Sequence, residues 1–293
     1  MSSGRLESIF KTNLNKDFIR NHYDKALIES WYKVQGKPLK YLGLPGWELL
    51  DILAWQEFLG GLTTIEREEN PQHLMFLRAN VANVEHRLHS LYGKFDKILL
   101  TGRDEYGKAP DWPYGLVNLD YFGGFIYPNL SRPKAIKKLV QNQATYTSSF
   151  LLVITQHLRE RDSTGEKKAF LEHLRGMLKS GTYDSSLHNG IDRIIDWYLD
   201  ADIPDAARQA LYMNYLLRDL GESEHFDVSC HPPILYSGTG RSWMIHFTAE
   251  FQFKGGIGHR VASHQTLIEL INLGVREVRD GVLAESQIVQ PRL

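Results

Sequence analysis

The sequence predicts an α/β protein built on a mostly parallel sheet with helices on both of its faces. Two observations support this class. In the first half of the chain, short apolar runs alternate with stretches of helical periodicity, and the connections between them are short. Four of the strand-like runs are also almost continuously apolar, which is the pattern expected when helices cover both faces of a sheet.

Composition allows a sizeable core and excludes several classes of protein. Of the 293 residues, 42% are hydrophobic and 24% charged, which is ordinary for a globular chain. The net charge of -1 shows no excess of Lys and Arg, so any nucleic-acid-binding groove has to be local. Cys230 is the only cysteine, which excludes an intramolecular disulfide and a zinc site of several thiolates.

No targeting or membrane segment is predicted. The first residues lack the apolar region of a signal peptide. No stretch approaches the roughly 18 apolar residues that a spanning helix needs. We therefore expect a cytoplasmic protein that does not associate with a membrane.

The order of the elements follows from periodicity and from Gly and Pro breaks. Residues 1–36 are predicted to form an N-terminal helical segment, with a helix over 5–35. The expected strands of the first half are 37–44, 62–68, 95–101, 114–122 and 149–158. The expected helices between them are 47–59, which ends at Gly60-Gly61, 71–92 and 132–146.

The second half changes character. Residues at about 160–222 form a helical insertion, with helices expected at 164–180, 188–200 and 204–220. Two strand-like stretches, 226–237 and 242–253, follow around a glycine-containing turn and predict a C-terminal antiparallel hairpin. A closing helix is expected over 259–280. We therefore predict one domain over 37–293 that carries the insertion.

Two features mark the first strands as a nucleotide site. Gly43-Leu44-Pro45-Gly46 joins a strand to a helix, where small residues let a ligand approach the backbone; an ordinary turn is the alternative. Glu66 ends the next strand, 20 residues after Gly46, a spacing at which an acid accepts hydrogen bonds from ribose hydroxyls. The alternative is a surface glutamate in a charged strand exit.

Two acids are predicted at later strand ends. Asp104 follows the expected strand 95–101, where it could accept a hydrogen bond from an adenine amino group, or simply belong to a polar loop. Asp120 ends the strand 114–122, next to Tyr121, Phe122 and two glycines. Ligands of open α/β sheets bind at the carboxyl ends of strands, so Asp120 is expected beside the ligand. The alternative is a strand end whose aromatic ring packs in the core.

Together these positions resemble the class I S-adenosylmethionine-dependent methyltransferases, which have a Rossmann-like fold. The resemblance covers roughly residues 37–158 and the hairpin at 225–253. It implies S-adenosylmethionine as cofactor. The cofactor-binding residues that it implies are Gly43, Leu44, Pro45, Gly46, Glu66, Arg67, Asp104 and Asp120, and the catalytic ones are Asp120, Tyr121 and Phe122.

The chain departs from that family at two motifs. Its first turn has fewer glycines, and Asp120-Tyr121-Phe122-Gly123 replaces the Asp/Asn-Pro-Pro-aromatic motif of enzymes that methylate nucleic-acid amines. In this it is nearer to methyltransferase-like proteins of bacterial mobile and defence loci. The first hypothesis is a methyltransferase acting on nucleic acid. The second is a degenerate subunit that binds nucleotide or nucleic acid, with protein partners, in a bacterial defence assembly.

Other chemistries have less support. An NAD(P)-dependent oxidoreductase would need a Gly-x-Gly-x-x-Gly turn, which is missing. The histidines show no metal-binding spacing, so no metal is expected. Cys230 lies inside a strand-like run, which indicates a structural role for this thiol.

Overall fold

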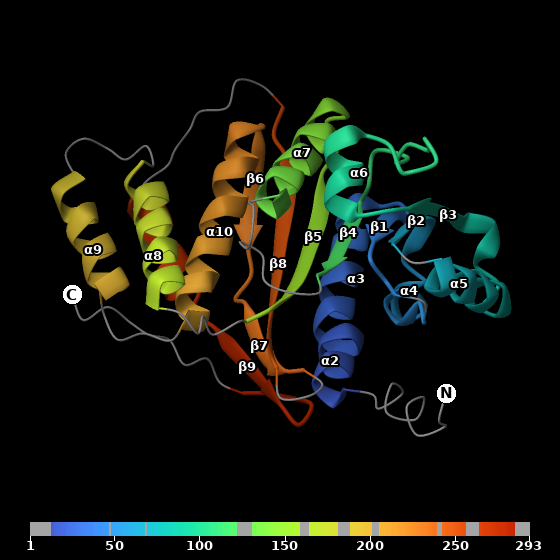
Figure 1. Cartoon of the computed structure of the whole chain (residues 1–293), viewed down its shortest axis with the longest axis horizontal. Coiled ribbons are helices and arrows are strands. Elements are labelled where there is room, and N and C mark those ends of the chain that lie inside the picture. Colours follow the sequence, from blue (N-terminus) through green and yellow to red (C-terminus); the bar gives the residue numbers. More distant parts are fainter. Residues whose placement is uncertain are drawn as a thin grey trace.

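The computed structural model describes residues 13–46, 48–67, 69–121, 131–158, 164–180, 188–200, 205–238, 242–255 and 264–284. These residues form one large mixed sheet with helices packed against it (Figure 1). The predicted class, a Rossmann-like α/β fold with a mostly parallel sheet, is confirmed.

Five parallel strands form the part of the sheet that carries the candidate site. They are β1 (Leu39–Gly43), β2 (Leu59–Glu66), β3 (Leu88–Tyr92), β4 (Leu116–Asp120) and β5 (Phe150–His157). Their order is β3-β2-β1-β4-β5, and every neighbouring pair is parallel. All five carboxyl ends therefore lie at one edge. The chain turns in opposite directions after β1 and after β4, and this switch point is where open α/β sheets bind ligands.

Both faces of this half-sheet are covered, because successive strand residues point to opposite sides. On one face, Tyr41, Leu116 and Leu151 pack with α3 (Lys25–Gln35), α4 (Leu50–Trp55) and α5 (Glu69–Val81). On the other face, the next residue of each strand packs with α6 (Phe95–Thr101) and α7 (Ser131–Thr145). This arrangement explains the continuous apolar runs of the sequence, because both faces of these strands are buried.

The second half of the sheet is mainly antiparallel. The long strand β8 (Trp243–Phe253) pairs with β5 on one side and with β6 (Phe226–Cys230) and β7 (Ile234–Ser237) on the other. The predicted strand 226–237 is interrupted at Pro232-Pro233, since proline has no N–H to donate to a ladder. The predicted antiparallel hairpin is confirmed by the pairing of β7 with β8.

The helical block lies where it was predicted, with α8 (Thr164–Lys179), α9 (His188–Asp200) and α10 (Asp205–Ser223). The closing helix is shorter than predicted: α11 spans His264–Asn272, and Arg276–Arg279 forms β9, which pairs with β7 and with β10 (Val282–Leu283). Among the residues described, no helix is both long and apolar enough to cross a membrane.

Two predicted elements around the third strand are wrong, and so is one predicted helix end. Residues 95–101 form the helix α6, whose Phe95, Ile98 and Leu99 are buried at helical spacing. The third strand is instead β3, residues 88–92, which was predicted as the end of a helix. Among the described strands β3 pairs with β2 alone, and His89 and Ser90 interrupt its apolar residues, so the segment lacks the continuous apolar run of the inner strands. Gly60 and Gly61 begin β2 and do not end a helix.

The N-terminal helices pack against both halves of the sheet. The segment consists of α2 (Leu14–Phe18), a π-helical turn η1 (Ile19–Asp24) and α3. Asn15 donates a hydrogen bond to the Ser237 hydroxyl at 3.0 Å, and its own carbonyl oxygen accepts from the Gly281 backbone N–H at 3.0 Å. The Asp24 carboxylate lies 2.8 Å from the His246 ring nitrogen Nε2 of β8. These contacts place α2 beside the antiparallel hairpin (Figure 1).

Candidate functional site

A cavity of about 1260 Å³ opens at the carboxyl ends of the parallel strands. Its walls come from the turns after β1, β2, β3, β4 and β5, from α2 and η1, and from the β7–β8 hairpin. The volume exceeds the roughly 300–1,000 Å³ usual for a site that holds one small molecule. The cavity is therefore large enough for two ligands side by side.

The turn after β1 lines this cavity through Leu44, Pro45 and Gly46. Gly46 has a φ of 64°, a left-handed conformation that a side chain disfavours, and no atom lies within 4 Å of where a Cβ would stand. Gly43 is not among the lining residues. A Cβ there would collide with the Tyr41 side chain and with the Asn118 backbone oxygen, so this glycine serves the close packing of β1 against β4.

Glu66 and Arg67 lie where the sequence analysis expected them, in the wall formed by the end of β2. The Glu66 Oε1 atom accepts a hydrogen bond of 2.7 Å from the Arg67 backbone N–H, which orients the carboxylate at the strand exit. Glu66 and Gly46 therefore line one common cavity, as the prediction of a nucleotide site requires.

Asp104 does not line the cavity that Glu66 and Asp120 share, so the structure does not bring it to the predicted site. Its carboxylate accepts three backbone N–H bonds, from Tyr92 at 3.1 Å, Tyr106 at 2.9 Å and Lys108 at 2.8 Å. Burial raises the pKa of Asp104, but these donors outweigh burial and hold it below its ordinary value. Asp104 thus fastens the loop after α6 to the end of β3. The prediction of Asp104 follows from the strand that was misplaced to 95–101.

Asp96, in the first turn of α6, is the acid that follows the true third strand and lines the cavity. It stands next to Phe95, whose ring meets the Tyr121 ring edge to face at 6.0 Å. Burial and then the charge of Asp96 raise the pKa of the Tyr121 hydroxyl well above its ordinary value. Asp96 and Tyr121 are therefore close neighbours in the wall between β3 and β4.

Asp120 and Tyr121 line the cavity at the end of β4, whereas Phe122 lies outside the described residues. Tyr121 is almost completely buried, and the Arg132 guanidinium lies 4.4 Å from the centre of its ring. Tyr121 therefore packs as well as lining the cavity. Asp120 is more open, and its Oδ2 atom accepts a short hydrogen bond from the Lys16 ammonium of α2.

A second ion pair from the N-terminal segment lies in the same wall. The Arg20 Nε atom is 2.5 Å from Asp51 Oδ1, and the Arg20 side chain is only 9% exposed. Arg20 also contacts Asp17 at 2.7 Å, and Asp51 accepts a hydrogen bond of 2.8 Å from the Asn118 side chain of β4. Burial opposes the charge of Arg20, but the Asp51 carboxylate outweighs it and raises the pKa of Arg20.

Among the lining residues that were not predicted from the sequence are Lys16, Arg20, Asp51 and Asp96. Lys16 and Arg20 are four residues apart on one helix face, a spacing that exposed basic pairs share, so the sequence carried no distinguishing mark. Asp51 interrupts the apolar run Leu49-Leu50-Asp51-Ile52-Leu53, and a lone acid in such a run was the available indication.

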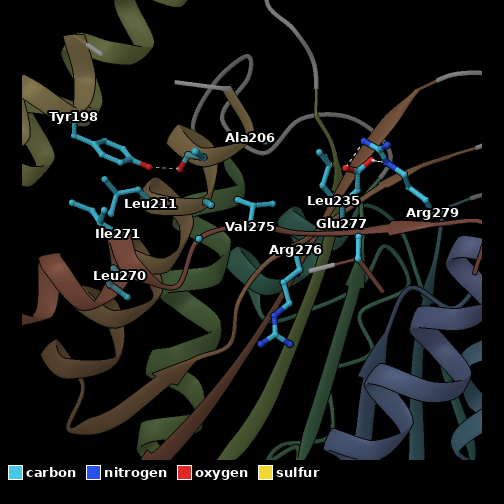
Figure 2. Close-up of a pocket in the computed structure, with 14 residues that line it drawn as sticks. Tyr198, Ala206, Leu211, Leu235, Leu270, Ile271, Val275, Arg276, Glu277 and Arg279 are labelled. Carbon is cyan, nitrogen blue, oxygen red and sulfur yellow. Dashed lines mark hydrogen bonds and ion pairs between the residues drawn. The ribbon is translucent and has the colours of Figure 1, made fainter. Parts of the chain in front are cut away.

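A second, smaller cavity of about 230 Å³ lies between α10, α11 and β9 and shares no described lining residue with the first (Figure 2). Alanines of α10 face Leu270 and Ile271 of α11 across it. Figure 2 shows the Arg279–Glu277 ion pair at its border. Tyr198 donates a hydrogen bond of 3.1 Å to the Ala207 carbonyl, which ties α9 to α10.

Cys230 takes no part in either cavity. Its Sγ atom lies 3.7 Å from the Asn214 carbonyl oxygen of α10, and burial raises the pKa of the thiol to about 12. Such a thiol is a poor nucleophile. This geometry agrees with the structural role predicted for it.

Fold and cavity together define a Rossmann-like α/β protein with a ligand-sized site at the switch point of its sheet. No protein-family model and no curated protein matches the sequence. Among solved structures, the chain is similar to a SAM-dependent methyltransferase from Agrobacterium tumefaciens, with 10% identity and a TM-score of 0.43. That match covers 80% of this chain and 62% of the other, less than two thirds of its length.

A second solved structure is magnesium protoporphyrin IX methyltransferase from Synechocystis PCC 6803 with bound SAH. It shows 10% identity and a TM-score of 0.38 over 85% of this chain and 94% of the other. Similarity at this level concerns only the path of the chain. The function therefore has to follow from the geometry of the site.

Proposed function

We propose that the protein is an S-adenosylmethionine-dependent methyltransferase whose large cavity binds the methyl donor. The observation that carries the proposal is the meeting of Gly46, Glu66 and Asp120 in one cavity at the carboxyl ends of β1, β2 and β4. Those are the strands on both sides of the switch point, where a nucleoside spans an open α/β sheet.

The chemistry of the cavity fits this donor. Its described lining residues include six carboxylates against five Lys and Arg side chains, and S-adenosylmethionine carries a net positive charge because of its sulfonium. The open turn at Gly46 lets a ligand approach the backbone without meeting a side chain. The volume leaves room for an acceptor group beside the donor.

Three parts of the cavity wall would hold the donor. Glu66 accepts hydrogen bonds from the ribose hydroxyls, the turn at Leu44–Gly46 lies against the amino-acid portion, and Asp96 replaces Asp104 as the acid on the adenine side. The bound donor supplies an activated methyl group. The protein then has to exclude water and hold the acceptor in line with that methyl, which accounts for much of the rate without acid–base chemistry.

For the acceptor we propose a nucleic-acid base that binds next to Asp120. The supports are the space beyond Asp120, which Tyr236 and Met244 border, and the carboxylate itself as a hydrogen-bond acceptor. Arg132 and Lys94 also line the cavity, and either can meet a phosphate.

Calorimetry with S-adenosylmethionine, its demethylated product and NAD tests the cofactor class. We expect the first two to bind and NAD not to bind. Glu66→Ala should weaken binding of both by about 10–100-fold, because it removes hydrogen bonds to a charged group. The control is Glu85→Ala, an exposed acid outside the cavity. If both variants bind S-adenosylmethionine as tightly as the natural protein does, the assignment of this cavity as the cofactor site is refuted.

The second candidate is a subunit that binds nucleotide without catalysis. The observation in its favour is the Lys16–Asp120 ion pair, because it engages the acid nearest the expected acceptor. Donor binding without methyl transfer to unmodified DNA or RNA would favour this candidate, and tritium transfer from the labelled donor would exclude it.

A further inference from the structure

The Lys16–Asp120 pair leaves one carboxylate oxygen available to the cavity. Lys16 contacts Oδ2, and no hydrogen bond to Oδ1 is found among the residues that the structure describes. The side chains are 37% and 24% exposed, so both border the cavity and neither is sealed in the core. Asp120 thus has one oxygen occupied by an ammonium and one oxygen that can meet a ligand.

The helix that carries Lys16 is held in place by contacts with the far half of the sheet. The Asn13 side chain caps α2 by accepting the Asn15 and Lys16 backbone N–H groups at 3.0 and 3.2 Å. The same side chain donates a hydrogen bond of 3.0 Å to the Ser237 carbonyl of β7. The cap therefore joins the position of Lys16 to the hairpin that borders the acceptor side of the cavity.

The π-helical turn η1 follows α2 directly. The two cations of this helical segment contact different acids. Lys16 precedes η1 and contacts Asp120 of β4, while Arg20 lies within η1 and contacts Asp51 of α4. Short π-helical stretches are rare and occur often at functional sites. The end of β4 and the helix α4 are thereby tied to one N-terminal element.

We infer that Lys16 is a positioning residue for the methyl acceptor, because it holds Asp120 through Oδ2 so that Oδ1 faces an N–H or O–H group of the acceptor. This inference rests on the proposed function and specifies the chemistry of its acceptor. Lys16 itself does not touch the acceptor. The N-terminal helices then belong to the active site.

The charge of Lys16 suits this role. Burial disfavours the ammonium form, but the charges of Asp120 and Asp51 outweigh burial and raise the pKa of Lys16 above its ordinary value. Lys16 therefore stays protonated at neutral pH and cannot act as a base toward the acceptor. A carboxylate or phosphate at Oδ1 is disfavoured by repulsion, so the group that meets Oδ1 is a hydrogen-bond donor.

The test compares adenosine with its dimethylamino analogue, which lacks the exocyclic N–H. Binding to the protein loaded with the demethylated cofactor is followed by ligand-observed NMR, which detects weak complexes. We expect the natural protein to bind adenosine at least about tenfold more tightly, because one hydrogen bond to a charged acceptor is lost with the analogue. Lys16→Met should reduce that preference to about twofold or less, and Lys16→Arg should restore it.

The matched control is Lys25→Met, which removes a lysine of the same helical segment whose ion pair with Glu57, at 2.7 Å, lies outside the cavity. It should keep the preference. Equal binding of adenosine and its analogue by the natural protein, or no binding of either, overturns the inference, as does a preference that survives Lys16→Met. Cofactor affinity is measured in each Lys16 variant as well, so that an effect on the demethylated cofactor is not mistaken for a lost preference.

Failure of the proposed function is distinguishable. If the demethylated cofactor does not bind, the proposed function fails, and the same two nucleosides are then titrated into the unloaded protein. A preference that depends on Lys16 would show there that Lys16 positions Asp120 toward a bound base, although not for methyl transfer, and its absence would overturn the role of Lys16 altogether.

Discussion

The buried Arg20–Asp51 pair allows a quantitative prediction about the N-terminal helix. Asp51→Asn keeps the size of the side chain but removes the charge opposite Arg20, whose side chain is only 9% exposed. Breaking a buried pair by removing one partner costs about 3–5 kcal/mol of stability. Because Arg20 keeps Asp17 at 2.7 Å, we expect a smaller loss of about 2–3 kcal/mol.

The assay is urea unfolding followed by circular dichroism, with the slope of the transition checked for equality between variants. The matched control is Glu57→Gln, the same acid-to-amide change in a pair whose acid is 58% exposed. Such surface pairs contribute about 0–1 kcal/mol. If Asp51→Asn costs no more than the control, the N-terminal helix is not held by a buried ion pair, and the reasoning about this wall of the cavity is refuted.

Three further predictions concern residues whose roles the structure separates. Asp104→Ala should lower stability by about 1–3 kcal/mol in urea unfolding while leaving cofactor affinity within about twofold. Because folding lowers the pKa of Asp104, its contribution should be present at neutral pH and disappear as the pH falls through that lowered pKa; a pH-independent difference would contradict this. Gly46→Ala and Gly36→Ala replace glycines that both have φ 64°, and each should lower the free energy of unfolding by about 1–2 kcal/mol. Only Gly46→Ala should also weaken cofactor binding in calorimetry. The Cys230 thiol is only partly buried but has its pKa raised to about 12, so it should react with Ellman's reagent much more slowly in the native protein than in the unfolded one at neutral pH, and equal rates would contradict the raised pKa.

Much of the fold was predictable because its strands and helices have strong local patterns. The runs at β1, β4 and β5 are nearly all apolar, and α7 to α10 have clear helical periodicity. The segment 88–101 was not predictable in this way. Residues 95–101 are rich in large apolar side chains that suit a strand or a buried helix equally, and only their packing decides.

The residues of the candidate site were likewise predictable only where the strand before them has a strong local pattern. The turn at Gly46, the acid Glu66 and the acid Asp120 each follow a strand with a strong pattern, so their common location was predicted from the sequence. Asp104 was chosen because of the misplaced strand, and Asp96, which lies just after the true strand β3 (Leu88–Tyr92), was therefore overlooked. A nucleic-acid substrate and a role in bacterial defence stay predictions of the sequence.

The sequence by itself determined the α/β class, the antiparallel hairpin and three of the strand-end residues, because these depend on periodicities and breaks that a few neighbouring residues encode. Only the tertiary structure decided that Lys16 meets Asp120 and that Arg20 meets Asp51. Those partners are 104 and 31 residues apart in the chain. Contacts over such separations arise from how helices and strands pack together, and no local pattern of residues records them.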